Sequence, residues 1–344
     1  MPTSGGGLRR QRRLPMGSDQ AVQDTADDAV LSKASAAALG YFVDPYVEAL
    51  ARRSHPTRRA PLINRGYFTR VAAIRDVAVQ FVQKCRADQL QSQIISLGGG
   101  FDTLVFTMTA HSLAPTVYVE VDFPTVCMKK RTLIQDTPLL ADVLGKYESG
   151  DDGSSAFIRN ERYVLVGADL RDLPGLEAAL RKAGVSFTVP TLFLSECVLV
   201  YMDAGPADAL VQWIPRTFHS DVAFVLYEQI LPDDPFGRTM CDNLRNRGCP
   251  LRSIDAHPTL QAQEQRFLSG GWAHAYAVDM ISVHGRVLDR DEVKRIERLE
   301  LFDEFEEWHL IQSHYCICLA GTSERFLSQP TFSRLQAAAS CTNT

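Results

Sequence analysis

Five short apolar segments, separated by longer stretches with helical periodicity, constrain the fold of this chain more than any other feature. The apolar segments are residues 93–97, 116–122, 162–169, 190–196 and 222–228. The clearest helical stretches between them are 176–183 and 206–218. Because strands that alternate with helices form a parallel sheet with helices on both faces, the order predicts an α/β fold with a doubly wound, mostly parallel sheet. Two later apolar runs, near 274–279 and 314–320, are expected to complete the sheet, the last one as an antiparallel strand near the edge.

The N-terminal part of the chain departs from this alternation. Residues 1–27 are rich in Gly, Arg, Ser, Asp and Gln and are predicted to form a disordered tail. A single domain is expected from residue 28 to residue 322. Its first part, 28–87, is predicted to be a helical extension that contains a loop at 52–65 and an amphipathic helix at 67–87.

Three further segments fit the alternation poorly. Residues 135–160 and 230–265 are interpreted as insertions. The second of them follows the fifth strand, so we expect it to form a cap above the carboxyl ends of the strands, where ligands bind to open α/β sheets. Residues 323–344 are interpreted as a C-terminal tail.

The composition excludes several classes of partner. A net charge of −5 argues against a nucleic-acid partner, because binding to phosphates needs a basic surface. No apolar run reaches the length of about 18 residues that a membrane span needs. The arginines at residues 9–13 are not followed by the apolar run of a secretory signal. We therefore expect a cytoplasmic protein without a membrane partner; the arginine cluster is either a solvated tail or a nuclear-import signal.

The eight cysteines carry no signature of a disulfide framework or of a metal site. Cys316 and Cys318 lie close in sequence to His309 and His314, which raises the alternative of a metal centre. The segment around them has the pattern of a buried strand, in which cysteine is common. No bound metal is therefore predicted.

Residues suited to an adenosine-containing cofactor stand at the ends of the predicted strands. The first strand runs into a triple glycine that begins at Gly98, where a ligand can approach the backbone closely. The second ends at Asp122, and an acid in that place typically binds the hydroxyls of a ribose. The third ends at Asp169, which could accept the adenine amino group, with Leu170 beside it to cover the ring. The fourth ends at Glu196.

A nicotinamide dinucleotide is the nearest alternative to this cofactor. Its fingerprint has a third glycine, but Thr103 occupies that position here. Asp102 would lie where the pyrophosphate approaches, and its carboxylate would repel the phosphates. S-adenosylmethionine has no phosphate and carries a sulfonium cation, so acids suit it better. An NAD-dependent oxidoreductase also needs an acid–base pair such as Tyr-x-x-x-Lys, which the sequence lacks. A non-catalytic binding module is a second alternative, but it would not need the acids at the strand ends.

The sequence resembles the leucine carboxyl methyltransferases from about residue 28 to about residue 322. The matching motifs are residues 60–70, 98–103, 120–124, 167–172 and 195–202. The resemblance implies an S-adenosylmethionine-dependent methyltransferase fold. It also implies transfer of a methyl group to the C-terminal leucine carboxylate of the protein phosphatase 2A catalytic subunit, which would be the protein partner. A small-molecule carboxyl or hydroxyl group is the alternative acceptor.

The resemblance also implies a set of site residues. Lys33 and Arg70 match the family's basic active-site residues and its cofactor contacts, and the remaining cofactor contacts match Gly98, Asp122, Asp169, Leu170 and Glu196. Arg70, Lys33 and Tyr201 are the candidate catalytic residues. Tyr201 either lines the pocket or packs on the following helix.

The expected chemistry needs no general base, because a C-terminal carboxyl group with a pKa of about 3.3 is already ionised. We therefore expect Arg70 and Lys33 to orient carboxylates, either that of the acceptor or that of the cofactor's methionyl group.

Overall fold

A computed structural model describes residues 19–51, 58–150 and 156–342. Within these ranges the chain forms one mixed sheet of nine strands in the order β3-β4-β5-β2-β1-β6-β7-β9-β8. The strands are β1 (Gln93–Leu97), β2 (Val117–Asp122), β3 (Glu148–Ser149), β4 (Ala156–Arg159), β5 (Tyr163–Gly167), β6 (Thr191–Glu196), β7 (Val222–Gln229), β8 (His274–Asp279) and β9 (Tyr315–Gly321). The five central strands, β5-β2-β1-β6-β7, are parallel. This confirms the predicted fold class.

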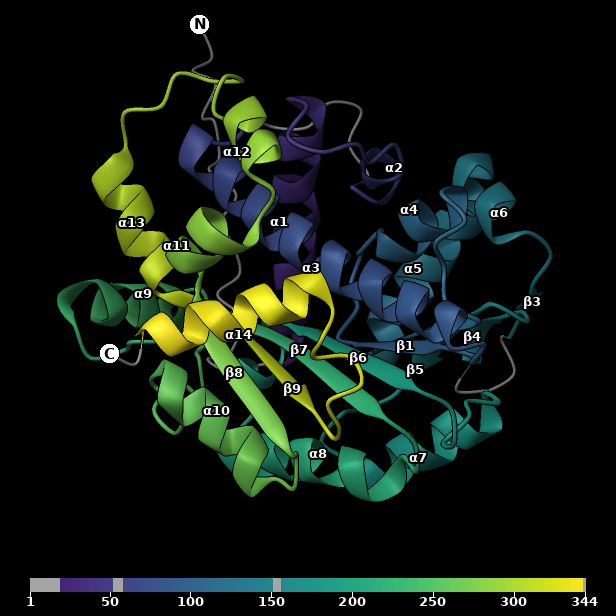
Figure 1. The fold of residues 1–344 in the computed structure, drawn as a ribbon. Coiled ribbons are helices and arrows are strands. Elements are labelled where there is room, and N and C mark those ends of the chain that lie inside the picture. Colours follow the sequence, from purple (N-terminus) through teal and green to yellow (C-terminus); the bar gives the residue numbers. More distant parts are fainter. Residues whose placement is uncertain (1–18, 52–57, 151–155, 343–344) are drawn as a thin grey trace, which may run out of the picture.

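Both faces of the sheet are covered by helices (Figure 1). One face carries α3 (Pro61–Ala87), α4 (Leu104–Ala110), α5 (Pro124–Asp136) and α14 (Pro330–Thr342). The other carries α7 (Leu173–Lys182), α8 (Ala204–Thr217) and α10 (Leu260–Ser269). Neighbouring residues of a strand serve opposite faces, so Ile94 belongs to the first core and Ile95 to the second. Burial on both sides explains why these strands are continuous apolar runs in the sequence.

The last two strands close the sheet in reversed order. β9 pairs antiparallel with β7 and lies between it and β8, which is also antiparallel to β9. The sequence-based expectation of a late antiparallel strand is therefore confirmed. Cys316 and Cys318 are fully buried in β9, which agrees with the strand interpretation of that segment.

Most of the remaining helices gather around the carboxyl ends of the parallel strands. They are α1 (Asp19–Ala38), α2 (Val47–Leu50), α9 (Pro235–Asn246), α11 (Met280–Ser282), α12 (Arg290–Ile296) and α13 (Phe305–Ser313). α6 (Pro138–Leu144) packs on α4 and α5 instead. Two short helical turns, η1 (Leu199–Tyr201) and η2 (Val283–Val287), complete the set. No helix in the described ranges is long and apolar enough to cross a membrane.

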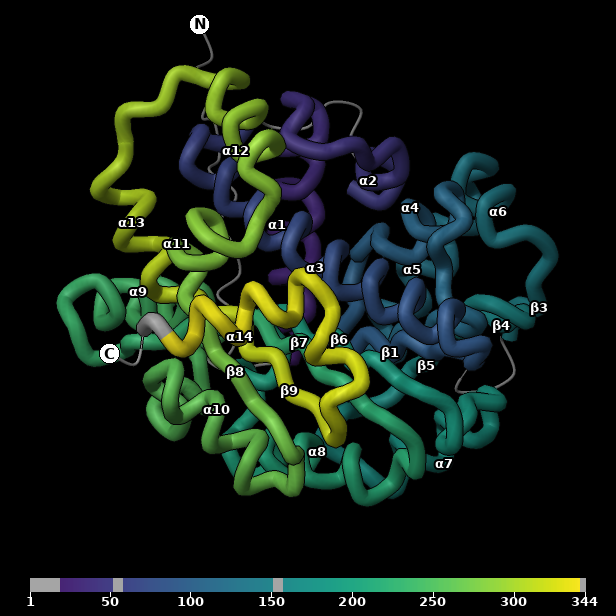
Figure 2. Tube along the Cα trace, in the orientation of Figure 1, coloured from purple at the N-terminus to yellow at the C-terminus, as the bar shows by residue number. Residues whose placement is uncertain are grey.

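Both predicted terminal tails are partly helical, which corrects the sequence-based boundaries. α1 begins at Asp19, so residues 19–27 are not a disordered tail; residues 1–18 lie outside the described ranges. α14 packs on β8 and α3, with Phe332 and Leu335 buried, so most of 323–344 belongs to the core (Figure 2). Both helices depend on tertiary contacts that local composition does not report.

Two internal segments also differ from their predictions. α3 begins at Pro61, inside the predicted loop 52–65, because proline is favoured in the first turn of a helix. Residues 52–57 lie outside the described ranges. The segment 135–160 is not a separate insertion. It supplies α6 and the antiparallel edge strands β3 and β4, which extend the sheet beyond β5.

Candidate functional site

A cavity of about 770 Å³ opens at the carboxyl ends of β1, β2, β5 and β6. Residues of α1 and α3 line it from the other side. All eight site residues proposed from the sequence line this one cavity: Lys33, Arg70, Gly98, Asp122, Asp169, Leu170, Glu196 and Tyr201. The topology explains the convergence, since parallel strands that end at one edge bring their following residues together.

The turn after β1 is built for close approach to its backbone. Gly98 has a φ of +62°, and a Cβ there would lie 2.5 Å from Cγ2 of Val198. Only glycine fits both restrictions. The Gly100 amide donates a hydrogen bond of 2.7 Å to the carboxylate of Asp122, so the turn is tied to the acid at the end of β2. Burial raises the pKa of Asp122 above its ordinary value.

The acid that follows β5 is held by a neighbouring arginine. Arg171 donates to both oxygens of Asp169, at 2.6 Å from Nη2 to Oδ2 and 2.9 Å from Nε to Oδ1, and these hydrogen bonds lower the pKa of Asp169. The same guanidinium donates to both carboxylate oxygens of Asp19 in the first turn of α1, at 2.9 and 2.8 Å. Leu170, between Asp169 and Arg171 in the sequence, is buried and lines the cavity.

The acid at the end of β6 forms the second polar centre of the cavity. Glu196 accepts a hydrogen bond of 2.6 Å from Nε of Arg70, which projects from α3. The guanidinium of Arg70 lies 4.6 Å from the ring centroid of Tyr227 and 5.7 Å from that of Tyr67. Burial opposes the charge of Arg70, but Glu196 outweighs it and the pKa of Arg70 is raised. The arginine therefore stays charged inside a largely aromatic wall.

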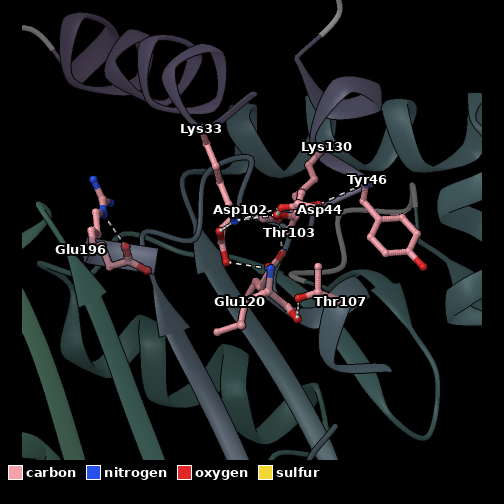
Figure 3. Close-up of polar contacts among 11 residues, drawn as sticks. Lys33, Asp44, Tyr46, Asp102, Thr103, Thr107, Glu120, Lys130 and Glu196 are labelled. Atoms are coloured by element: carbon pink, nitrogen blue, oxygen red, sulfur yellow. Dashed lines mark hydrogen bonds and ion pairs between the residues drawn. The ribbon is translucent and has the colours of Figure 1, made fainter. Parts of the chain in front are cut away.

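Lys33 reaches the cavity from α1, but its ammonium group contacts protein atoms. Nζ lies 2.7 Å from Oδ1 of Asp102, 2.6 Å from the hydroxyl of Thr103 and 3.5 Å from Asp44 (Figure 3). Burial opposes the charge, but Asp102 outweighs it and the pKa of Lys33 is raised. Lys33 and Arg70 therefore differ: the lysine fixes the turn after β1, whereas the arginine lies among rings beside Glu196.

Tyr201 lies on η1, directly after β6, and lines the cavity. A buried network holds this turn from behind. The Val200 amide donates to Glu228 at 2.7 Å, and the Ser253 hydroxyl donates to the Leu199 carbonyl at 3.0 Å. Burial raises the pKa of Tyr201, so its hydroxyl is protonated at neutral pH.

Several lining residues have no role in the sequence-based site. Tyr67 lies inside the motif at 60–70, so the resemblance could have indicated it. Tyr227 and Tyr315 stack at 5.3 Å between ring centroids and reach the cavity from β7 and β9. In the sequence they are indistinguishable from core strand residues, because only the pairing of β7 with β9 places them together. Arg247, just after α9, also lines the cavity from the segment predicted to be a cap.

Comparison with known proteins confirms the predicted resemblance. A model of the leucine carboxyl methyltransferase family matches residues 17–215. The leucine carboxyl methyltransferase 1 homolog of Arabidopsis thaliana is 47% identical over 302 residues, which cover 87% of this chain and 89% of that protein. Leucine carboxyl methyltransferase 1 of Bos taurus is 39% identical over 320 residues, which cover 91% and 94%.

A third relative is longer. The tRNA wybutosine-synthesizing protein 4 of Homo sapiens is 42% identical over 307 residues, which cover 88% of this chain but 44% of that protein. The chain therefore spans less than half the length of this relative. The family model and the two relatives of similar length show that this chain belongs to the leucine carboxyl methyltransferase family.

Proposed function

We propose that the protein transfers a methyl group from S-adenosylmethionine to the C-terminal leucine carboxylate of the protein phosphatase 2A catalytic subunit and so forms a methyl ester. One observation carries the proposal: a partly buried arginine, Arg70, shares a cavity with the glycine turn and the acids at the strand ends. The arginine suits an anionic acceptor, and the acids suit a cationic cofactor.

The residues around the glycine turn fit S-adenosylmethionine. Gly98 lines the cavity, and the contact with Val198 leaves no room for a Cβ, so only glycine can hold the turn at this place. Asp122 would bind the ribose hydroxyls, Asp169 would accept the adenine amino group, and Leu170 would cover the ring. When bound, this cofactor supplies a methyl group on a sulfonium, and the carboxylate of Glu196 is suited to a nearby positive charge.

The protein's own contribution is to bind, orient and dehydrate the acceptor. The acceptor carboxylate needs no general base at neutral pH, since its pKa is about 3.3. Arg70 would hold it through the planar guanidinium fork, and the rings of Tyr67 and Tyr227 would exclude water from the ion pair. Tyr201, on its buttressed turn, would form the adjoining wall. Alignment and desolvation are then the sources of rate enhancement.

Lys33 is assigned a supporting part in this proposal. Its ammonium group is already engaged by Asp102, Thr103 and Asp44. We therefore assign Lys33 to the stability of the turn that faces the cofactor and leave Arg70 as the residue that binds the acceptor carboxylate.

The direct experiment is to incubate the purified protein with S-adenosylmethionine and the intact phosphatase 2A catalytic subunit at neutral pH. Mass spectrometry should find one added methyl group on the terminal leucine. A subunit without that leucine should gain none. Methyl on both substrates, or on neither, would contradict the proposed acceptor. If neither is methylated, calorimetry with S-adenosylmethionine shows whether the cofactor proposal survives.

A further inference from the structure

A fully buried ion pair lies beneath the glycine turn and has no part in the proposed chemistry. Glu120, in the middle of β2, and Lys130, on α5, are 1% and 0% exposed. Nζ of Lys130 lies 2.6 Å from Oε2 of Glu120. Desolvating two charges is costly, and well-packed apolar residues often give equal or greater stability in such places. Stability alone therefore gives no reason for the pair.

The pair is in direct contact with the turn. A Cβ at Gly99 would lie 3.3 Å from Cβ of Glu120, so the turn rests on this side chain. Lys130 also donates a hydrogen bond of 2.9 Å to the main-chain carbonyl of Asp102, at the end of the turn. The Tyr163 hydroxyl donates to the same Glu120 oxygen at 2.7 Å, which fixes the carboxylate from β5. The ion pair thus joins β2, β5 and α5 to the turn.

Asp102 is the point at which two lysines meet. Lys130 holds its carbonyl, and Lys33 of α1 holds its carboxylate at 2.7 Å (Figure 3). The other carboxylate oxygen, Oδ2, accepts from the Leu104 amide at 3.0 Å, at the start of α4. The carbonyl and the side chain of one residue are therefore fixed by cations from two different helices. The position of the turn from Gly98 to Asp102 depends on both contacts.

We propose that Lys130 and Glu120 are positioning residues for the cofactor. They fix the position of the Gly98–Asp102 turn relative to β2, so that the backbone of the turn faces the cavity. Neither side chain is exposed to the cavity, and neither lines it. The inference rests on the proposed cofactor, S-adenosylmethionine, but is independent of the acceptor. It deepens the proposed function by explaining how a glycine-rich turn acquires one fixed position.

The test uses the double variant Lys130→Met/Glu120→Gln in the full chain. It removes both charges together, keeps an acceptor for Tyr163 and deletes the hydrogen bond to the Asp102 carbonyl. We expect a melting temperature close to that of the unmodified protein. The Kd for S-adenosylmethionine, measured by calorimetry, should rise about tenfold, as expected for the loss of one charge-assisted hydrogen bond that fixes the turn.

Tyr163→Phe is the matched control. It removes a hydrogen bond from the same Glu120 oxygen but from no atom of the turn, so the Kd should stay within about twofold of the unmodified value. A Kd within about twofold for the double variant would overturn the proposal. So would an equal loss of affinity in Tyr163→Phe, which would indicate general loosening of the core.

Two further outcomes are separable. If the double variant does not fold, Lys130→Gln/Glu120→Gln, which also removes both charges, decides: a Kd raised by more than about twofold supports the positioning role, and an unchanged Kd overturns it. If the unmodified protein does not bind S-adenosylmethionine, the proposed cofactor fails and this inference fails with it. If the protein binds the cofactor but does not methylate the phosphatase, only the proposed acceptor fails.

Discussion

Arg70 shows how far its surroundings set the role of a single residue. An arginine on a helix is usually solvated, but this one lies between the Tyr227 ring and Glu196 inside the cavity. Within the described ranges, Nε is the guanidinium nitrogen that pairs with a carboxylate. Arg70 lines the cavity that an acceptor carboxylate could enter. A planar fork is suited to two parallel hydrogen bonds, and an ammonium is not.

Replacement of Arg70 tests this role at the residue scale. Arg70→Ala is expected to lower kcat/KM for the phosphatase subunit by about a hundredfold or more, because it removes a charge-assisted contact and leaves Glu196 unpaired. Arg70→Lys should recover only part of the loss. Steady-state kinetics and calorimetry with S-adenosylmethionine separate the two substrates. A large loss of cofactor affinity with an unchanged KM for the phosphatase would move Arg70 to the methionyl carboxylate.

His284 predicts a dependence of stability on pH. Its Nδ1 lies 2.9 Å from the Thr69 hydroxyl, and its ring packs on Trp308 at 4.9 Å between centroids. Burial, together with the charges of Arg65 and Arg290, lowers the pKa of His284 to about 4. The unfolded chain therefore binds a proton between pH 6.5 and 4 that the folded protein does not bind. Stability from this residue is lost as the pH falls through that window.

The expected size of this effect follows from the two pKa values. Between pH 7 and pH 5 the free energy of unfolding should fall by about 2 kcal/mol through His284. Urea unfolding at the two pH values measures it. His284→Asn, which keeps a polar atom near Thr69 but does not titrate, should lose about that much of the pH dependence. An equal pH dependence in the variant would contradict the assignment.

At the scale of elements, α1 lines one side of the cavity, and different interactions hold its two halves in place. Its second half is packed into the core through Val30 and Ala34. Its first half has few large apolar contacts, although Ala26 lies 3.2 Å from the place of a Cβ at Gly100. Exposed polar pairs hold that half in place, among them Asp19 with Arg171. Such pairs contribute little each, so this half should open more readily than the rest of the fold.

Arg171→Ala tests this opening. The variant frees both Asp19 and Asp169, so dissociation of S-adenosylhomocysteine should be faster by up to about tenfold, the limit for a few exposed ion pairs. Stopped-flow displacement measures the rate. Arg181→Ala is the control, since Arg181 forms an exposed pair with Glu177 within α7, and neither residue lines the cavity. Equal dissociation rates in the two variants would contradict a role for the Asp19–Arg171 pair in holding the first half of α1 over the cofactor.

At the scale of the whole molecule, the cavity collects residues from almost the entire described chain. Its lining begins at Asp19 in α1 and ends at Tyr315 in β9. A ligand bound there contacts the N-terminal helices, the strand ends and the α9 segment together. Binding should therefore stabilise the fold as one unit and not one region of it.

This linkage predicts a cofactor-dependent melting temperature. At a hundredfold excess over its Kd, S-adenosylmethionine should add about 2.7 kcal/mol to the free energy of unfolding. Differential scanning fluorimetry should show a rise with this cofactor and with S-adenosylhomocysteine. NAD at the same concentration should leave the melting temperature unchanged. A melting temperature that rises with NAD but not with S-adenosylmethionine would contradict the proposed cofactor and favour a dinucleotide.

The sequence by itself determined the strands other than β3 and β4, and much of the candidate site. Strands buried on both faces must be apolar throughout, so β1 and β8 were predicted with their observed bounds, and β9 within one residue at each end. The residue that follows a parallel strand lies at the ligand-binding edge whatever its partners are. The acids at the ends of β2 and β6, and the acid just after β5, could therefore be predicted from the sequence to form one site.

Tertiary structure alone decided the rest, because the deciding contacts join residues far apart in the chain. Lys33 meets Asp102 across 69 positions, and Arg171 meets Asp19 across 152. No local pattern encodes such a pair, and for that reason the sequence assigned Lys33 to a carboxylate of either the acceptor or the cofactor and left the first half of α1 as a tail. From the sequence, Glu120 and Lys130 look like an ordinary acid in a strand and an ordinary lysine in a helix, with nothing to pair them. Only the packing of α5 under the glycine turn turns them into one structural unit.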